Sequence, residues 1–177
     1  MPFTPYHFGP SGFVGLVFKK WIDLPVFVLA NVVVDVEVLI IEIFHLGWPV
    51  HRYAHTLLLG AVVGALWGVA AYPLRPVFNK VMQLFRIPYQ SSLKMMIVSG
   101  VLGVWLHVLI DAVDHFDLRL FWPNTTISLY QLLHPYIRQG YVKIICLIFF
   151  VPAIILYILT VIKSRKNLKQ TRTSIEK

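Results

Sequence analysis

The 177 residues are enough for one domain, and 58% of them are hydrophobic whereas only 14% are charged. A soluble domain has about 25% charged residues, so a soluble fold of this composition would lack the polar side chains to cover its surface. The net charge is +8, but the basic residues of the C-terminal segment are not interleaved with aromatic ones, which argues against a nucleic-acid partner. The single cysteine, Cys146, excludes an internal disulfide and a cysteine-based zinc site. We therefore expect an integral membrane protein whose main partner is the lipid bilayer.

Taken in chain order, the apolar segments predict one short helix and four transmembrane helices. The first segment, at about residues 11–18, is too short to span and predicts a re-entrant or interfacial helix. Four longer segments are each near the roughly 20 residues that cross a bilayer core: residues 26–44, 56–73, 95–116 and 141–162. Helices are required there because lipid cannot satisfy free backbone groups. The predicted fold is an all-α polytopic bundle over residues 1–162, followed by a basic cytoplasmic tail at 163–177.

Two further patterns concern packing and orientation. Gly60, Gly64 and Gly68 recur at a spacing of four, which predicts close packing of the second long helix against a neighbour. The link between the second and third long helices contains four basic residues and no acid, whereas the link at 117–140 is less basic. The positive-inside rule then places the first link and the C-terminus in the cytoplasm, and the link at 117–140 outside.

Ionisable side chains are costly inside membrane helices and usually mark function. The most informative pattern is His107-x-x-x-Asp111-x-x-Asp114-His115 near the outer end of the third long helix. These four residues fall on one helical stripe, so imidazole and carboxylate groups are offered together, as a zinc or manganese site requires. The alternative is that they are interfacial residues hydrated among the lipid headgroups.

A second pattern, His51-Arg52-x-x-His55, opens the second long helix. The spacing of the two histidines lets both point at one ion, and Arg52 between them could bind an anionic substrate group. An interfacial helix start is the alternative explanation, since such residues are common there. The predicted topology places this pair and the His107/Asp111 pair at the same outer membrane face.

Two carboxylates, Asp35 and Glu37, lie inside the first long helix. Because they are two residues apart, an ideal helix points them in different directions, and we favour Asp35 as the metal ligand. A pair neutralised by protonation or by a basic neighbour is the alternative. A lone histidine near a terminus is usually solvated, and this is the alternative for His7. If a short helix descends and the first long helix climbs back, with arms of about 15 Å each, His7 and Asp35 reach similar heights.

In this order, Thr4-Pro5-x-His7, Asp35-x-Glu37, His51-Arg52-x-x-His55-Thr56 and His107-x-x-x-Asp111 resemble the bacterial inner-membrane, LexA-regulated, YdjM-like metal-dependent hydrolases. The resemblance covers roughly residues 1–117. That family is grouped with zinc-dependent phospholipase C and P1 nuclease, which bind clustered zinc through His and Asp. The resemblance implies a bacterial inner-membrane location and a divalent metal, zinc or alternatively manganese. Its implied ligands are His7, Asp35, His51 or His55, His107 and Asp111.

The expected function is a metal-dependent hydrolase that acts on a lipid or lipid-linked phosphoester through metal-activated water near the outer membrane face. In this scheme Arg52 contacts the anionic substrate, and Glu37 or Asp114 serves as the base. Two other classes stay open: a non-catalytic membrane protein whose polar residues join helices, and a small metal-ion or proton transporter.

Overall fold

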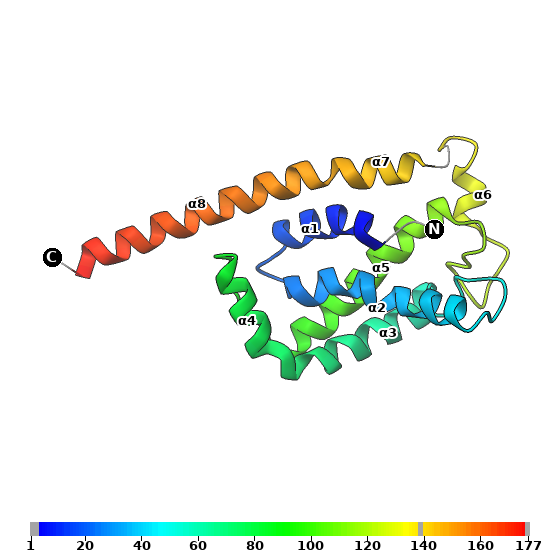
Figure 1. Ribbon diagram of the computed structural model, residues 1–177, viewed down its shortest axis with the longest axis horizontal. Helices are drawn as coiled ribbons and strands as arrows, with labels where there is room; N and C mark the ends of the chain where they lie inside the picture. The colour runs from blue at the N-terminus through cyan, green and yellow to red at the C-terminus, as the bar shows by residue number, and fades with distance from the viewer. Residues whose placement is uncertain (1–3, 138–139, 176–177) are drawn as a thin grey trace.

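The computed structural model describes residues 4–137 and 140–175, with side chains described for residues 5–137 and 140–166. Every regular element in this part of the chain is a helix, which confirms the predicted all-α class. In chain order (Figure 1) the helices are η1 (Thr4–His7), α1 (Phe8–Val17), α2 (Leu24–Ile43), α3 (Leu57–Ala71), η2 (Tyr72–Leu74), α4 (Arg75–Leu84), α5 (Leu93–Asp114), α6 (Leu129–Leu133), α7 (Tyr141–Ile148) and α8 (Phe150–Ile175).

Within the described residues, four helical segments are long and apolar enough to cross a membrane. They are Leu24–Ile43, Leu57–Leu84, Leu93–Asp114 and Tyr141–Lys166, and each overlaps one predicted span. The second continues past the predicted stretch through η2 and α4, and the fourth joins α7 to α8. The segment predicted as a basic tail therefore begins inside α8, whose backbone is helical to Ile175. The helix α1 is the short N-terminal helix expected from the sequence.

The first three long helices begin at side-chain caps. Asp23 accepts a hydrogen bond from the backbone N–H of Val26 at 3.0 Å, so it fixes the start of α2. Thr56 and Ser92 accept from residues three positions later and start α3 and α5 in the same way. Such caps satisfy backbone N–H groups that have no partner inside the helix.

The contact between α3 and α5 depends on glycines, as their spacing predicted. A Cβ built on Gly100 of α5 would lie 2.1 Å from the carbonyl oxygen of Gly64 in α3. A Cβ on Gly68 would lie 2.5 Å from the Cα of Ile97. Only hydrogen fits at such a distance, so the two backbones pack against each other directly. Gly103 allows α2 the same approach on another side of α5, since its Cβ would lie 2.4 Å from the carbonyl oxygen of Phe27.

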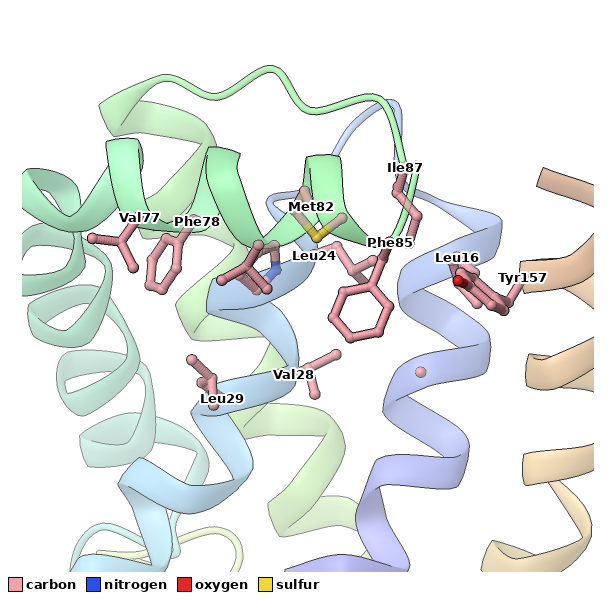
Figure 2. Close-up of a pocket in the computed structure, with 13 residues that line it drawn as sticks. Leu16, Leu24, Val28, Leu29, Val77, Phe78, Met82, Phe85, Ile87 and Tyr157 are labelled. Atoms are coloured by element: carbon pink, nitrogen blue, oxygen red, sulfur yellow. The ribbon is translucent and has the colours of Figure 1, made fainter. Parts of the chain in front are cut away.

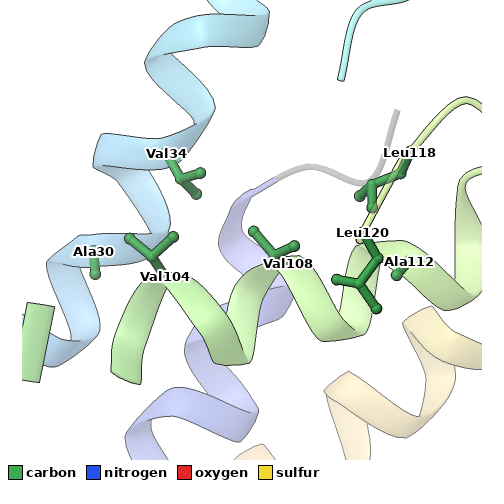
Figure 3. Packing of buried hydrophobic residues seen from close by; sticks show 7 residues of the cluster. All are labelled: Ala30, Val34, Val104, Val108, Ala112, Leu118 and Leu120. Carbon is green, nitrogen blue, oxygen red and sulfur yellow. The ribbon is translucent and has the colours of Figure 1, made fainter. Parts of the chain in front are cut away.

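The helix α5 is consequently at the centre of the bundle. Figure 3 shows Val104 and Val108 of α5 beside Ala30 and Val34 of α2, with Leu118 and Leu120 closing the cluster beyond the C-terminal end of α5. These side chains are at most 3% exposed. This dry core holds α2 and α5 in a fixed relation, and both helices carry the ionisable residues of interest.

The two ends of the bundle differ in character. At one end (Figure 1) lie the N-terminal part of α1, the α2–α3 loop and the C-terminal end of α5. At the opposite end lie the α1–α2 turn (residues 18–23), α4 and the α4–α5 loop (residues 85–92), here called the basic end. The helix α4 occupies part of the predicted link, and its buried Phe78 and Met82 pack it onto the bundle. Figure 1 also shows α8 extending well beyond the other helices.

Candidate metal centre

The centre is built on the C-terminal half of α5. His107 and Asp111 are 0% and 2% exposed, and His107 Nε2 lies 3.0 Å from Asp111 Oδ2. Helical spacing of four residues brings the two side chains together, as predicted. From α2, Asp35 adds its Oδ1 atom at 3.1 Å from the same nitrogen of His107. The close packing of α2 on α5 therefore brings two carboxylates to one imidazole.

His55 joins this group from the loop that precedes α3. Its ring is fully buried, and its Nε2 atom lies 3.5 Å from Asp35 Oδ1. One potential ligand atom from each of four residues lies within 4.8 Å of the others: Asp35, His55, His107 and Asp111. Two atoms bound to one zinc ion at about 2.0–2.1 Å in tetrahedral geometry are about 3.3 Å apart. The spacing of these donors therefore fits one shared divalent ion.

His7 reaches the group from the start of α1. Its Nε2 atom lies 3.0 Å from Asp111 Oδ1, and its ring stacks on that of His107 with the centroids 4.2 Å apart. The backbone carbonyl of His7 accepts a hydrogen bond from Ser11 at 2.6 Å, and Asn31 of α2 donates to that same hydroxyl at 3.1 Å. These bonds tie α1 to α2 and hold His7 at the height of Asp111.

Three buried imidazole nitrogens face these carboxylates. The Nε2 atoms of His7, His55 and His107 each lie 3.0–3.5 Å from a carboxylate oxygen of Asp35 or Asp111. Neutral imidazole and carboxylate are also the donors that zinc and manganese accept. The residues present therefore fit a divalent metal ion.

The opposite side of the His55 ring is fixed by Glu37. Glu37 Oε2 lies 3.0 Å from His55 Nδ1, and the carboxylate also accepts hydrogen bonds from the backbone N–H groups of Arg52, Tyr53 and Ala54. Burial disfavours the protonated form of His55, but the carboxylates of Asp35 and Glu37 outweigh it and raise the pKa of His55. Asp35 and Glu37 thus approach opposite nitrogens of one ring. A carboxylate behind a metal-ligating histidine sets its tautomer and orientation.

His51 takes a different position from the one that the sequence suggested. Residues 51–55 form a loop and not the first turn of α3, which begins at Leu57. His51 Nδ1 lies 3.0 Å from Asp117 Oδ2, and that carboxylate also accepts from the backbone N–H of His51 at 3.1 Å. His51 Nε2 is 4.0 Å from Asp111 Oδ2, at the edge of the group. The two histidines converge because Glu37 and Asp117 hold the loop, not because of helical spacing.

His51 also belongs to a second potential ligand group with His115 and Asp117. The His51 and His115 ring centroids are 4.3 Å apart, and His115 Nε2 has no hydrogen-bond partner among the described residues. Burial raises the pKa of Asp117, but the hydrogen bond from His51 outweighs this effect, so the pKa of Asp117 is lowered overall. Burial is the main cause of the lowered pKa of His115. Both shifts favour the forms that bind metals, carboxylate and neutral imidazole.

The three predicted catalytic residues have distinct surroundings. Arg52 donates from its guanidinium to the backbone carbonyls of Leu46, Gly47 and Pro49, so it closes its own loop. Glu37 is engaged with His55 and the same loop, as described above. Asp114 is buried at 7% exposure, and its Oδ1 atom has no hydrogen-bond partner among the described residues. The geometry therefore favours positioning roles for Arg52 and Glu37 and leaves Asp114 as the candidate base.

Sequence reasoning did not single out Asp117, which fixes His51. The signal available was its place in Asp111-x-x-Asp114-His115-x-Asp117, directly after the helix that carries the strongest ligand pair.

Comparison of the chain with protein-family models, with curated proteins and with solved structures finds no match.

Proposed function

We propose that the protein is a membrane-embedded, metal-dependent hydrolase that acts on a lipid or lipid-linked phosphoester. The observation that carries the proposal is the convergence of three buried Nε2 atoms, from His7, His55 and His107, on the carboxylates of Asp35 and Asp111. We infer zinc as the ion, with manganese as the alternative, from the mixture of imidazole and carboxylate donors. A bound ion of this kind supplies Lewis acidity and activates water at neutral pH. The same reaction class is implied by the resemblance to YdjM-like hydrolases.

The residues of the chain divide into ligands and positioning groups. Asp35, His55, His107 and Asp111 would hold one ion, and His7 adds a further imidazole at Asp111 Oδ1. Because Asp111 Oδ2 also faces His51 at 4.0 Å, Asp111 lies between the two ligand groups and could serve both. Glu37 and Asp117 orient His55 and His51 through their other ring nitrogens. Asp114 is our candidate for the base that accepts a proton from water, because its buried Oδ1 atom has no hydrogen-bond partner among the described residues.

The proposed substrate class follows from the position of the centre. The ligands lie toward one end of helices long and apolar enough to cross a membrane, so lipid of the adjoining leaflet is the substrate pool nearest to them. We place this end at the outer face of a bacterial inner membrane and the C-terminus in the cytoplasm. The supporting observation is the basic character of the other end, with Lys19, Lys20, Arg75 and Arg86.

The test is hydrolysis by the purified full-length protein, stripped with chelator and reloaded with zinc or manganese. Phosphatidylglycerol and a polyprenyl phosphate are the probes. We expect cleavage by the reloaded wild type and by His134→Ala, a histidine outside the centre, and loss of cleavage in Asp111→Asn. Cleavage of a carboxylic ester but of neither phosphoester would refute the substrate class.

The alternative is a non-catalytic membrane protein, and one structural observation supports it as well. The contacts of His7, Asp35, His51 and His55 join α1, α2 and the α2–α3 loop to α5, so they could act purely as links between helices. In that case Asp111→Asn would lower the unfolding temperature without changing metal content. A transporter is distinguished by uptake of zinc or protons into proteoliposomes.

A further inference from the structure

A polar cavity lies at the basic end of the molecule, far from the candidate metal centre. Its volume is about 770 Å³, and its lining contributes three ammonium groups and several hydroxyls: Lys19, Lys20, Lys163, Ser91, Ser92 and Thr160. Ser92 caps α5, so the positive end of this 22-residue helix also lies at the cavity. The cavity thus gathers positive charge from the α1–α2 turn, from α5 and from α8.

No ion pair neutralises this positive charge within the described part of the chain, and the carboxylate behind the cavity wall, Asp23, is buried and accepts from Tyr89 and Ser91. No carboxylate of the described residues lies within ion-pair distance of the three ammonium groups, since every ion pair found joins a histidine to an acid. Lys19 is half-buried and donates a hydrogen bond to Thr160 Oγ1 of α8. Its burial and the nearby charges of Lys163 and Lys20 lower the pKa of the Lys19 amine. An anion in the cavity would relieve this repulsion.

An apolar groove of about 520 Å³ lies next to this cavity, between α1, α2, α4 and α8. Figure 2 shows side chains from all four helices around it, among them Leu16, Val28, Met82 and Tyr157. The exposed atoms of its lining are entirely apolar. A groove of this kind, on the outside of a bundle with membrane-spanning helices, suits a hydrocarbon chain.

The linings of the groove and the cavity adjoin along three segments of the chain. Leu16 lines the groove and Lys19 lines the cavity, three residues later. Tyr157 and Thr160 repeat this relation on α8, where residues three apart lie on one face. Ile87 and its neighbour Pro88 do the same in the α4–α5 loop. An apolar chain in the groove would therefore lead directly to a headgroup among the lysines.

We propose that the groove and the cavity together bind one anionic phospholipid, with its phosphate at Lys19, Lys20 and Lys163 and an acyl chain between α1, α4 and α8. The site is independent of the proposed hydrolase. His7 and Lys19 lie beyond opposite ends of α1, whose ten residues separate them by about 15 Å. Lipid binding here would fix α4 and α8 against the bundle core.

The experiment is native mass spectrometry of the full-length protein, titrated in detergent with phosphatidylglycerol or with phosphatidylcholine of the same acyl chains. The test variant is Lys19→Gln with Lys163→Gln. The matched control is Lys80→Gln with Lys166→Gln, which removes equal charge from residues that line neither cavity. A lysine near anionic lipid contributes about five-fold to affinity, so the test variant should bind phosphatidylglycerol about 30-fold more weakly. The control should match the wild type, and phosphatidylcholine should bind weakly to all three.

Two further arms separate a phospholipid from a free anion. Dihexanoyl phosphatidylglycerol should bind more weakly than the long-chain lipid, because it fills less of the apolar groove. Val28→Trp, which fills the groove from α2, should weaken long-chain binding and leave short-chain binding unchanged. Equal loss in both double-lysine variants would reduce the effect to diffuse attraction and overturn the proposal. Displacement by inorganic phosphate with no dependence on chain length would overturn it as well, in favour of a free-anion site.

Discussion

Replacement of Gly100 with alanine tests whether close packing of α3 on α5 builds the candidate centre. The added Cβ would lie 2.1 Å from the carbonyl oxygen of Gly64, so the helices must separate by about 1 Å or more to reach ordinary contact. Overpacking of this kind costs about 1–3 kcal/mol. For a chain of this size that corresponds to a fall in unfolding midpoint of roughly 2–12 °C. The same separation would move His55, just before α3, away from His107 on α5.

Two readings on the purified protein check this prediction, the unfolding midpoint and the metal content. Metal sites tolerate distance errors of only about 0.2 Å, so we expect Gly100→Ala to lose most of its metal as well as stability. Gly12→Ala is the matched control, because its Cβ would lie 3.9 Å from the Cβ of Ala153, an ordinary contact. A Gly100→Ala protein with wild-type midpoint and metal content would refute the reasoning.

Three further predictions concern residues that position the rest. Glu37→Gln keeps the size of the side chain but removes the charge behind His55 Nδ1, so chelator competition should show metal affinity about 10–100-fold weaker; equal affinity would contradict the positioning role. Asp23→Ala removes the cap of α2 and the acceptor of Tyr89 and Ser91, so thermal unfolding should show a loss of about 2–4 kcal/mol with metal content retained. Asp117→Ala frees His51, so phosphoester hydrolysis should fall at least about ten-fold while one ion stays bound; loss of all metal would contradict two separate ligand groups.

The sequence predicts the helices well because their physical causes are local. Four apolar stretches of membrane-spanning length correspond to the four long helical segments, and the glycines at 60, 64 and 68 lie where α3 meets α5. The pairing of His107 with Asp111 is equally local, since helical spacing alone brings them together. Asp35 and Glu37 do not diverge as the ideal helix predicts, because both carboxylates meet the His55 ring, one at each nitrogen.

What the sequence does not reveal depends on contacts between distant segments. His51 and His55 resemble a helix start, but Glu37 and Asp117 hold these residues in a loop from 15 or more positions away in the chain. An aspartate after a helix is more often solvated than buried, so Asp117 gives no local sign of its role. The sequence does not predict the helix α4, for a similar reason. Its buried Phe78 and Met82 pack onto α2 and α5 residues that only the folded bundle brings near.

The central claim is that imidazoles and carboxylates from α1, α2, α5 and the α2–α3 loop share a divalent cation. Elemental analysis of the purified full-length protein tests it most directly, with His55→Ala and Asp111→Ala measured beside the wild type and His134→Ala. We expect stoichiometric zinc or manganese in the wild type and in His134→Ala, and close to none in the other two variants. A wild type without transition metal, or equal metal in all four proteins, would contradict it.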